Sequence, residues 1–357
     1  MTKISSSLIL SLCFLVSFSQ TSKTKIEMIA ANWNVTEEAT FEKFDNRETL
    51  LLKRGRITVK NQKFINGSIE VDVYANTVRS FAGITFRKND NTMEEVYMRL
   101  HKTNQADAVQ YTPIFNNESN WQLYREHQAN VLFKNKGWNA LRIEINNDQA
   151  EVFVNNEKVM TISNLRTDNT SGEIGLFALF SNRFSNFRIT PKESSKESEK
   201  VRETPTDLNI IRQWKITEAK LFNRQRLNFK DFLKEKYITV TTEKSGLLPI
   251  SKYIKKASSG NFEQNTEDYT IAFTNISSEK EETKLFSFDY SDTILVYLNG
   301  KIIFEGKNGF RTKGVQYMGH LDINTNTLYL PLKKGNNTIH CVVIDKANGW
   351  GLMAKLQ

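Results

Sequence analysis

The sequence is poor in the residues that define several protein classes. It has 5 prolines and 16 glycines in 357 residues, which excludes collagen-like and proline-rich architectures. Of its 2 cysteines, Cys341 is the one outside an N-terminal apolar run. One thiol and four scattered histidines offer neither an internal disulfide, nor the ligand pairs of a tetrahedral zinc site, nor a Cys–His catalytic pair.

Charge of one sign and long apolar runs are also scarce. The 49 lysines and arginines exceed the 40 acidic residues by only nine, and they form no basic block of the kind that nucleic-acid binding needs. No segment after the first twenty residues is long and apolar enough to span a membrane. A P-loop, GxGxxG and GxSxG are missing, which argues against nucleotide-dependent and serine-hydrolase chemistry.

The first twenty residues have the layout of a secretory signal peptide. Lys3 precedes the apolar run Leu8 to Phe18, and small or polar residues follow at Ser19 and Gln20. We therefore expect residues 1–20 to be removed, and the mature chain to be secreted or periplasmic.

What the chain does have favours β structure, with 23 Phe and 11 Tyr among frequent Ile, Val and Thr. Residues 191–206 hold balanced charges and one large apolar side chain, so they predict a linker between a domain at 21–190 and another at 207–357. Short alternating segments fill the first domain, among them SIEVDVY and a segment at 121–124, with Asn-rich turns between them. The predicted fold class is all-β, with two β-sandwich (jelly-roll) domains joined by a polar linker.

The segments NGSIEVDVYA, FAGITFR, EEVYMRLHK, AEVFVNNEKVMTI and GEIGLFALF…FSNFRI resemble the concanavalin A-like (laminin G-like) jelly-roll superfamily over nearly all of residues 30–190. In the second half, ILVYLNGKIIFEG, LYLPLKKGNNTIHCVVID and the terminal GWG are similar to galactose-binding-like β-sandwich modules. The first resemblance implies a jelly-roll fold, and members of that superfamily often bind or act on carbohydrates. The second implies a module of the kind appended to glycan-active enzymes.

Carboxylates are the first candidates for chemistry. Glu70 and Asp72 lie two residues apart on a strand and so share one face, as the nucleophile and helper of laminarinase-type glycosidases do. The further acid that such enzymes need is replaced by Tyr74 and Ala75, and a half-exposed strand shows the same alternation. Glu95 and His101 are the other candidate acids or bases, although neither has a partner at fixed spacing.

A mixture of aromatic, amide and guanidinium side chains lies between residues 87 and 124. Such a mixture suits sugars, whose ring faces pack on aromatic rings and whose hydroxyls bond to amides and guanidinium groups. Period-two spacing predicts that Tyr97, Arg99 and His101 share one strand face, with the others on neighbouring segments. The predicted ligand-binding residues are Arg87, Tyr97, Arg99, His101, Gln110, Trp121 and Tyr124. The alternative is that the aromatic residues belong to the core.

Two loops, KNDNTMEE and RTDNTSGE, carry oxygen-rich side chains, and jelly rolls of this kind often hold a calcium ion. Asp90 and Asp168 are therefore candidate ligands of a structural calcium ion, the one cofactor that we consider. Turn chemistry explains these Asp-Asn pairs equally well.

Three functions remain. The leading hypothesis is an exported, non-catalytic protein that binds a glycan or oligosaccharide on the jelly-roll sheet face, because no complete catalytic set is present. The second is a hydrolase acting on glycans or keto-disaccharides, with Glu95, His101 or Glu70 as acid or base. The third is a protein-interaction module of the cell envelope.

Overall fold

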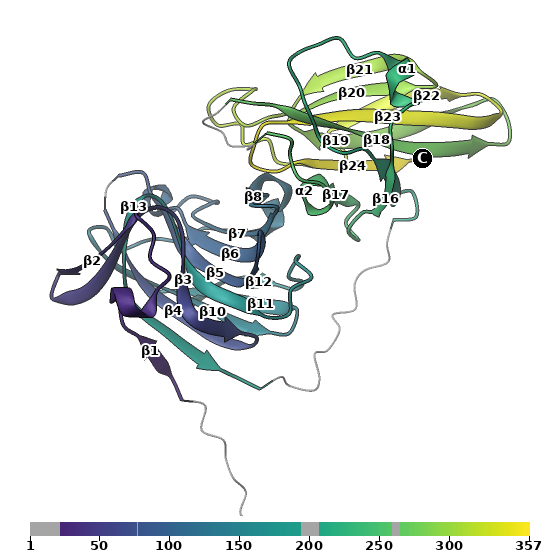
Figure 1. The fold of residues 1–357 in the computed structure, drawn as a ribbon. Coiled ribbons are helices and arrows are strands. Elements are labelled where there is room, and N and C mark those ends of the chain that lie inside the picture. The colour runs from purple at the N-terminus through teal and green to yellow at the C-terminus, as the bar shows by residue number, and fades with distance from the viewer. Residues whose placement is uncertain (1–21, 77, 194–206, 259–264) are drawn as a thin grey trace, which may run out of the picture.

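In the computed structural model of the protein, the described residues are 22–76, 78–193, 207–258 and 265–357 (Figure 1). The predicted signal peptide, residues 1–20, lies outside them, as do residues 194–206 of the predicted linker. Among the described residues, no helix is long and apolar enough to cross a membrane.

Residues 24–191 form one antiparallel sheet that curls into two layers. Its strands are β1 (Thr24–Ile26), β2 (Ala39–Phe44), β3 (Arg47–Phe64), β4 (Gly67–Ala75), β5 (Phe81–Asn89), β6 (Thr92–Met98), β7 (Val109–Phe115), β8 (Glu118–Ser119), β9 (Gln128–Ala129), β10 (Gly137–Asn146), β11 (Gln149–Val154), β12 (Glu157–Ile162) and β13 (Gly172–Pro191). Short 3-10 helices interrupt them at η1 (Ala30–Asn32), η2 (Leu100–Lys102), η3 (Trp121–Leu123) and η4 (Arg125–His127).

The long strands β3 and β13 run through both layers and join them. The first part of β13 pairs with β5, and its second part pairs with β4. Between the two parts, the pairing of β13 with β3 is interrupted at Phe180 and Ser181, which have positive φ angles of 64° and 41°. One layer therefore contains β5, β6 and β7, and the other contains β4, β10, β11 and β12.

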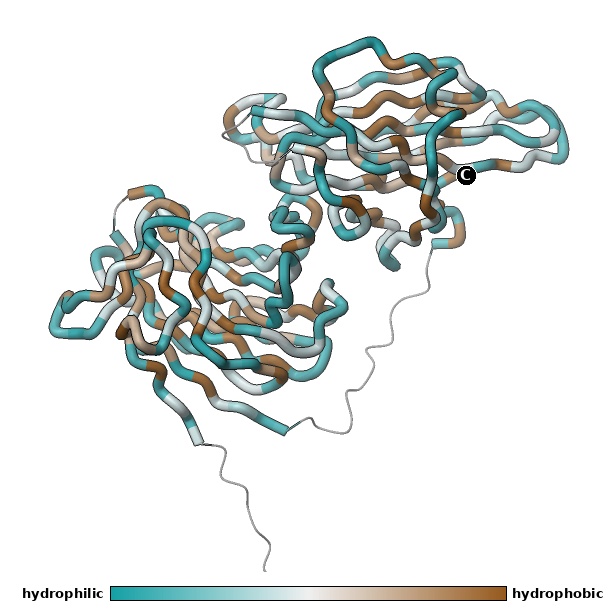
Figure 2. The backbone as a smooth tube through the Cα atoms, in the orientation of Figure 1, coloured by the Kyte–Doolittle hydropathy of each residue, from teal (hydrophilic) through white to brown (hydrophobic). Residues whose placement is uncertain are grey.

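Alternation along the strands fills the space between these layers. Ile69, Val71 and Val73 of β4 are buried in the same apolar core as Val96 and Met98 of β6. Figure 2 shows hydrophobic stretches of the chain, in brown, within this part of the molecule and within the second half. The residues between them in sequence point away from the core, so each layer presents an outer face of polar and aromatic side chains.

Residues 213–356 form a second sandwich of two sheets. One sheet contains β14 (Gln213–Ile216), β15 (Lys220–Leu221), β16 (Ile238–Thr241), β18 (Asp268–Ser278), β20 (Thr293–Leu298), β21 (Lys301–Lys307) and β23 (Gly335–Asp345). The other contains β17 (Leu247–Pro249), β19 (Glu282–Ser291), β22 (Asn326–Leu332) and β24 (Gly351–Leu356). Two short helices, α1 (Phe229–Phe232) and α2 (Ile250–Tyr253), accompany them.

The core of the second sandwich lies between its two sheets. Phe286 and Phe288 from β19 meet Val296 from β20 and Cys341 from β23, and all four are fully buried. Cys341 is thus a core residue, as its apolar surroundings in the sequence predict. The predicted all-β fold class is confirmed, with two β-sandwiches built from antiparallel strands.

The two sandwiches contact each other directly, beside β8 and α2 (Figure 1). Asn120 and Ser251 share a hydrogen bond of 2.7 Å, and Asn116 donates to the carbonyl of Ser251 at 2.8 Å. The segment 116–128 supplies most of the contacts that the first sandwich makes with the second. It is not the strand expected at 121–124, because residues 121–123 form the 3-10 helix η3 and dock on the second sandwich.

Candidate functional site

The outer face of the β5–β6–β7 layer gathers the polar side chains that the core excludes. Antiparallel pairing places Arg56 of β3 opposite Phe177 of β13, and Tyr97 of β6 opposite Gln110 of β7. Gly83 of β5 joins these two pairs, since it pairs with both Phe177 and Tyr97. We call this set of side chains the outer face, and define it by Arg56, Phe177, Thr85, Glu95, Tyr97 and Gln110, of which the last four are buried.

An ion pair crosses the outer face. Arg56 Nε lies 2.8 Å from Glu95 Oε2, although β13 and β5 separate their strands. Gly175 and Gly83 stand on those intervening strands, where a Cβ atom would lie within 2.1 Å of a neighbouring backbone oxygen. The outer face has no side chain at these two positions, which leaves room for the Arg56 side chain to reach the carboxylate.

Glu95 combines burial with a positively charged neighbour. Its side chain is 1% exposed, whereas that of Arg56 is 24% exposed. Burial raises the pKa of the Glu95 carboxyl, and the Arg56 guanidinium only partly opposes this. The hydroxyl of Thr85, opposite Glu95 in the sheet, is buried and has no hydrogen-bond partner among the described residues. A carboxyl of raised pKa is what proton transfer near neutral pH requires.

Aromatic rings extend the outer face from Glu95 toward the bend of β13. The Phe177 and Tyr97 ring centroids are 5.7 Å apart, those of Tyr97 and Phe81 6.1 Å apart, and those of Phe81 and Phe180 6.0 Å apart. Phe180 is 47% exposed. His101 joins this group, with its ring 5.1 Å from that of Phe81 and its Nδ1 in contact with the backbone of Ser80.

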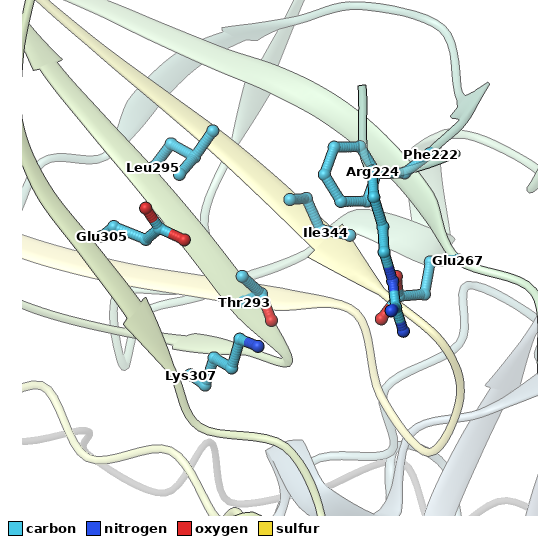
Figure 3. Close-up of a pocket in the computed structure, with 8 residues that line it drawn as sticks. All are labelled: Phe222, Arg224, Glu267, Thr293, Leu295, Glu305, Lys307 and Ile344. Atoms are coloured by element: carbon cyan, nitrogen blue, oxygen red, sulfur yellow. The ribbon is translucent and has the colours of Figure 1, made fainter. Parts of the chain in front are cut away.

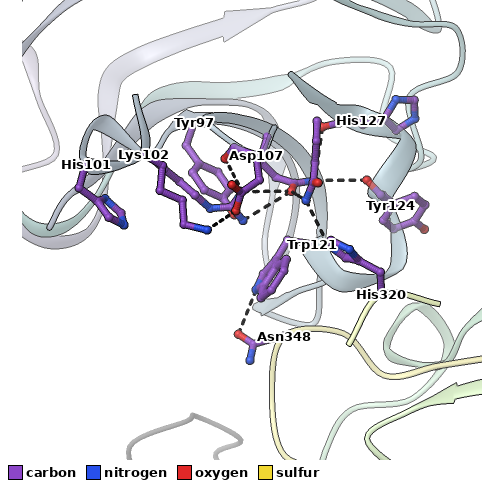
Figure 4. A network of polar contacts seen from close by, with 12 residues as sticks. Tyr97, His101, Lys102, Asp107, Trp121, Tyr124, His127, His320 and Asn348 are labelled. Carbon is purple, nitrogen blue, oxygen red and sulfur yellow. Dashed lines mark hydrogen bonds and ion pairs between the residues drawn. The ribbon is translucent and has the colours of Figure 1, made fainter. Parts of the chain in front are cut away.

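A buried polar network lies beside this aromatic series (Figure 4). Arg99 donates to the Tyr97 hydroxyl at 3.1 Å and to the carbonyl of Asp107 at 2.7 Å. Gln110 Oε1 accepts a hydrogen bond of 2.7 Å from Gln128. The prediction that Arg99 and His101 share a strand face with Tyr97 is wrong, because β6 ends at Met98 and the chain turns into η2. The turn still leaves Arg99 beside Tyr97.

Trp121 and Tyr124 do not form the open sugar platform that the sequence suggests. Trp121 is 9% exposed and donates to the side chain of Asn348 in the second sandwich at 3.0 Å (Figure 4). Tyr124 is fully buried and donates to Glu243 at 2.7 Å. Both side chains hold the two sandwiches together, which removes them from the accessible surface.

Two further candidates lie away from the outer face. Arg87 is buried where its guanidinium contacts the backbone carbonyls of Ile65 and Asn147, and burial lowers its pKa. Glu70 belongs to β4 in the other layer, where Lys23 Nζ lies 2.8 Å from its carboxylate. Neither contributes to the group around Glu95.

The candidate calcium ligands belong to two loops that contact each other, since the Asn169 side chain donates to the backbone carbonyls of Arg87 at 3.0 Å and Thr92 at 3.3 Å. Asp90 stands in the turn between β5 and β6 with a positive φ of 48°, and the exposed Asp168 pairs with Lys252 at 3.1 Å. In the described part of the chain, no group of three or more His, Cys, Asp or Glu is arranged to hold a metal ion. Calcium binding stays a prediction.

Sequence reasoning missed Arg56, Phe81, Phe177 and Phe180 as members of this surface. Phe81 and Phe177 lie in strands that the sequence predicts, on the alternating positions opposite the buried ones. That alternation alone could have identified Phe81 and Phe177 as outward-facing residues. No pattern in the sequence indicates the Arg56–Glu95 ion pair, because it joins residues 39 positions apart on non-adjacent strands.

The second sandwich has a shallow hollow on one sheet, of about 320 Å³ (Figure 3). Leu295 and Ile344 lie on its floor, and its lining also includes Phe222, Arg224, Glu267, Thr293, Glu305 and Lys307. Two positive and two negative side chains balance one another there, so the hollow favours neither anions nor cations.

Residues 27–190 match the family model of the 3-keto-alpha-glucoside-1,2-lyase-like domain. The match covers the first sandwich, including the whole of the outer face. It spans 164 of the 357 residues, a little under half of the chain. No curated protein matches the chain.

Several solved structures of carbohydrate-related proteins are similar to part of the chain. A carbohydrate-binding module of Bacillus subtilis is 12% identical, with a TM-score of 0.36, covering 44% of this chain and 96% of that one. A lichenase derived from a mouse hindgut metagenome is 11% identical, with a TM-score of 0.35, covering 48% and 100%. A galectin of Caenorhabditis elegans is 12% identical, with a TM-score of 0.30, covering 44% and 98%. At these identities and scores the likenesses carry no functional argument.

Proposed function

We propose that the first sandwich binds a carbohydrate on its outer face. The observation that carries this proposal is the series of rings from Phe177 to the exposed Phe180, next to the Arg56–Glu95 pair. Aromatic rings accept the apolar face of a sugar, and the guanidinium and carboxylate groups bond to its hydroxyls. The match to the 3-keto-alpha-glucoside-1,2-lyase-like family also supports a carbohydrate as the ligand.

The binding proposal is tested with the intact protein on a glycan array, followed by calorimetry with the glycans that bind. Phe180→Ala should lower the affinity about fivefold, because it removes an exposed ring worth on the order of 1 kcal/mol. Leu132→Ala is the matched control, since Leu132 is a 74% exposed apolar residue of the same sandwich and lies outside the aromatic series. A wild-type protein that binds no glycan would refute the proposal.

A second candidate function is a lyase reaction on the same face. Two observations favour it, namely the family match and the buried Glu95 carboxyl with its raised pKa. In a 3-keto-glucoside, the C2 proton is acidic because C2 is adjacent to the ketone. Glu95 would accept that proton, and the C–H electron pair would form the C1=C2 double bond. The C1–O bond then breaks, and the departing oxygen leaves with its electron pair and takes up a proton.

Arg56 has a defined part in that reaction. Proton removal next to a ketone places negative charge on the ketone oxygen, and a guanidinium beside the base stabilises such charge. The Arg56 side chain is partly exposed and already lies 2.8 Å from Glu95. It is therefore the group best placed to meet a bound sugar and the base together.

Turnover of a 3-keto-glucoside separates the two functions. Glu95→Gln should lower the rate by about 10² to 10⁴ while affinity changes little, because a general base is lost and a polar group of equal size remains. Glu70→Gln is the control, since that carboxylate lies on the other layer. If the wild-type protein binds the sugar but releases no product, it is a binding protein only.

We also propose that the chain is exported, on the pattern of residues 1–20 alone. Sequencing the N-terminus of the mature protein tests this. A mature chain that begins at Met1 would contradict it.

A further inference from the structure

The outer face of the first sandwich does not end at its own last strand. Gln110 of β7 pairs with Gln128 of β9 in the sheet, and Gln128 continues the line from Tyr97. Gln128 Nε2 lies 3.2 Å from Nε2 of His320, which belongs to the second sandwich (Figure 4). A line of side chains therefore runs from β6 across β7 and β9 onto the other sandwich.

The loop that carries His320, residues 308–325, is held firmly against η3. Gln122 donates to the carbonyl of Met318 at 2.7 Å. A Cβ atom on Gly319 would lie 2.4 Å from Gln122 Nε2, so glycine permits this approach. The rings of Phe310 and His320 both meet the Trp121 ring edge-on, each with centroids 5.8 Å apart. These contacts fix His320 relative to the outer face.

His320 is suited to hydrogen bonding with a neutral ligand. Burial and nearby Arg125 and Arg99 lower its pKa to about 4, so the ring is uncharged at neutral pH. Because the Gln128 amide donates to Nε2, the ring proton lies on Nδ1. Nδ1 has no hydrogen-bond partner within the part of the chain that the structure describes, and the half-buried ring leaves it available as a donor.

We infer that the second sandwich supplies one wall of the carbohydrate site, with His320 as a specificity-determining residue for a second sugar ring. The inference rests on the proposed function. Neighbouring strands are about 4.8 Å apart, so β6 and β9, two strands apart, are separated by roughly 10 Å. A ligand bound at Glu95 on β6 therefore reaches His320 only if it is longer than one ring. The site would select a disaccharide or longer oligosaccharide over a monosaccharide.

The experiment compares a monosaccharide and the matching disaccharide by calorimetry with the full-length protein. His320→Ala should weaken binding of the disaccharide about tenfold and leave the monosaccharide unchanged. His320→Gln should restore most of the disaccharide affinity, because an amide can donate in place of Nδ1. Val315→Ala is the control, since Val315 is a 75% exposed residue of the same loop.

The outcomes separate this inference from the function on which it depends. If Phe180→Ala weakens binding but His320→Ala leaves both affinities unchanged, the inference is wrong and the binding proposal stands. An equal loss for both sugars also overturns it, because that result would indicate a general disturbance of the interface. If the wild-type protein binds neither sugar, both proposals fail. Unchanged melting temperatures of the variants confirm that they fold.

Discussion

Leu123 of the first sandwich packs against Gly351 of the second so closely that a Cβ atom on Gly351 would lie 2.5 Å from Leu123 Cδ2. A Cβ atom on Gly349 would lie 2.9 Å from Cγ of the same leucine. Leu123 also belongs to an apolar cluster with Tyr124 and with Leu247 of the second sandwich. The glycines on either side of Trp350 therefore make room for the first sandwich, while Trp350 itself is buried in the core of the second.

Gly351→Ala should destabilise the protein by about 1 to 3 kcal/mol, because the added methyl group overpacks the contact with Leu123. Urea unfolding of the full-length protein measures the change. Gly137→Ala is the control, since the nearest atoms to a Cβ there are 3.8 Å away and no unusual backbone angle is required. Equal unfolding midpoints for the two variants would show that Leu123 has room to move.

Lys256 is the ionic counterpart of this apolar contact. Its side chain is 2% exposed, and its Nζ lies 2.7 Å from Asp345 and 3.3 Å from Glu118 of the first sandwich. It also donates to the carbonyl of Lys346 at 2.8 Å. The buried Lys256 ammonium group thus forms ion pairs with one carboxylate from each sandwich.

Lys256→Met should cost about 3 to 5 kcal/mol of stability, because it leaves buried carboxylates without their counter-charge. The matched control is Lys252→Met, which breaks the exposed pair with Asp168 and should cost less than about 1 kcal/mol. Denaturant unfolding of both variants checks the difference. Comparable losses would mean that the buried carboxyls are satisfied in another way.

Local chemistry explains the parts of the fold that the sequence predicts. The Asn299–Gly300 turn joins β20 and β21 with φ angles of 50° and 82°, and Asn155–Asn156 joins β11 and β12 with 52° and 73°. These residue types tolerate positive φ, so the hairpins are readable from neighbouring residues alone. Period-two alternation holds within β6, but the predicted shared face of Tyr97, Arg99 and His101 does not extend past Met98, where that strand ends.

The rest of the candidate site depends on contacts between distant residues, which alternation does not encode. Trp121 bonds to Asn348, 227 residues away, and this contact turns a predicted sugar platform into an interdomain contact. His320 meets Gln128 across 192 residues. Composition correctly marked the region 87–124 as rich in polar and aromatic groups. It could not distinguish the side chains that a second sandwich would cover.

The pKa of Glu118 makes the contact between the sandwiches sensitive to pH. Burial raises it to about 7, and Lys256 only partly opposes this effect. In an unfolded chain a glutamate titrates near 4.3. Between these two values the folded protein keeps a proton that the unfolded chain has released, so the free energy of unfolding falls as the pH rises from about 4.5 to 7. Asp292, whose pKa burial and Asp345 also raise to about 7, acts in the same direction.

Glu118→Gln should flatten this dependence, because the variant carries a permanently neutral group where the wild type must hold a proton. Its advantage in melting temperature over the wild type should be absent near pH 4.5 and grow as the pH approaches 8, where the wild-type carboxyl is ionised. Part of the slope should persist through Asp292. Melting curves at several pH values test this, with Glu70→Gln on the opposite layer as the control. Wild-type and Glu118→Gln curves that stay parallel over the whole range would show that Glu118 ionises as easily in the folded protein as in the unfolded chain.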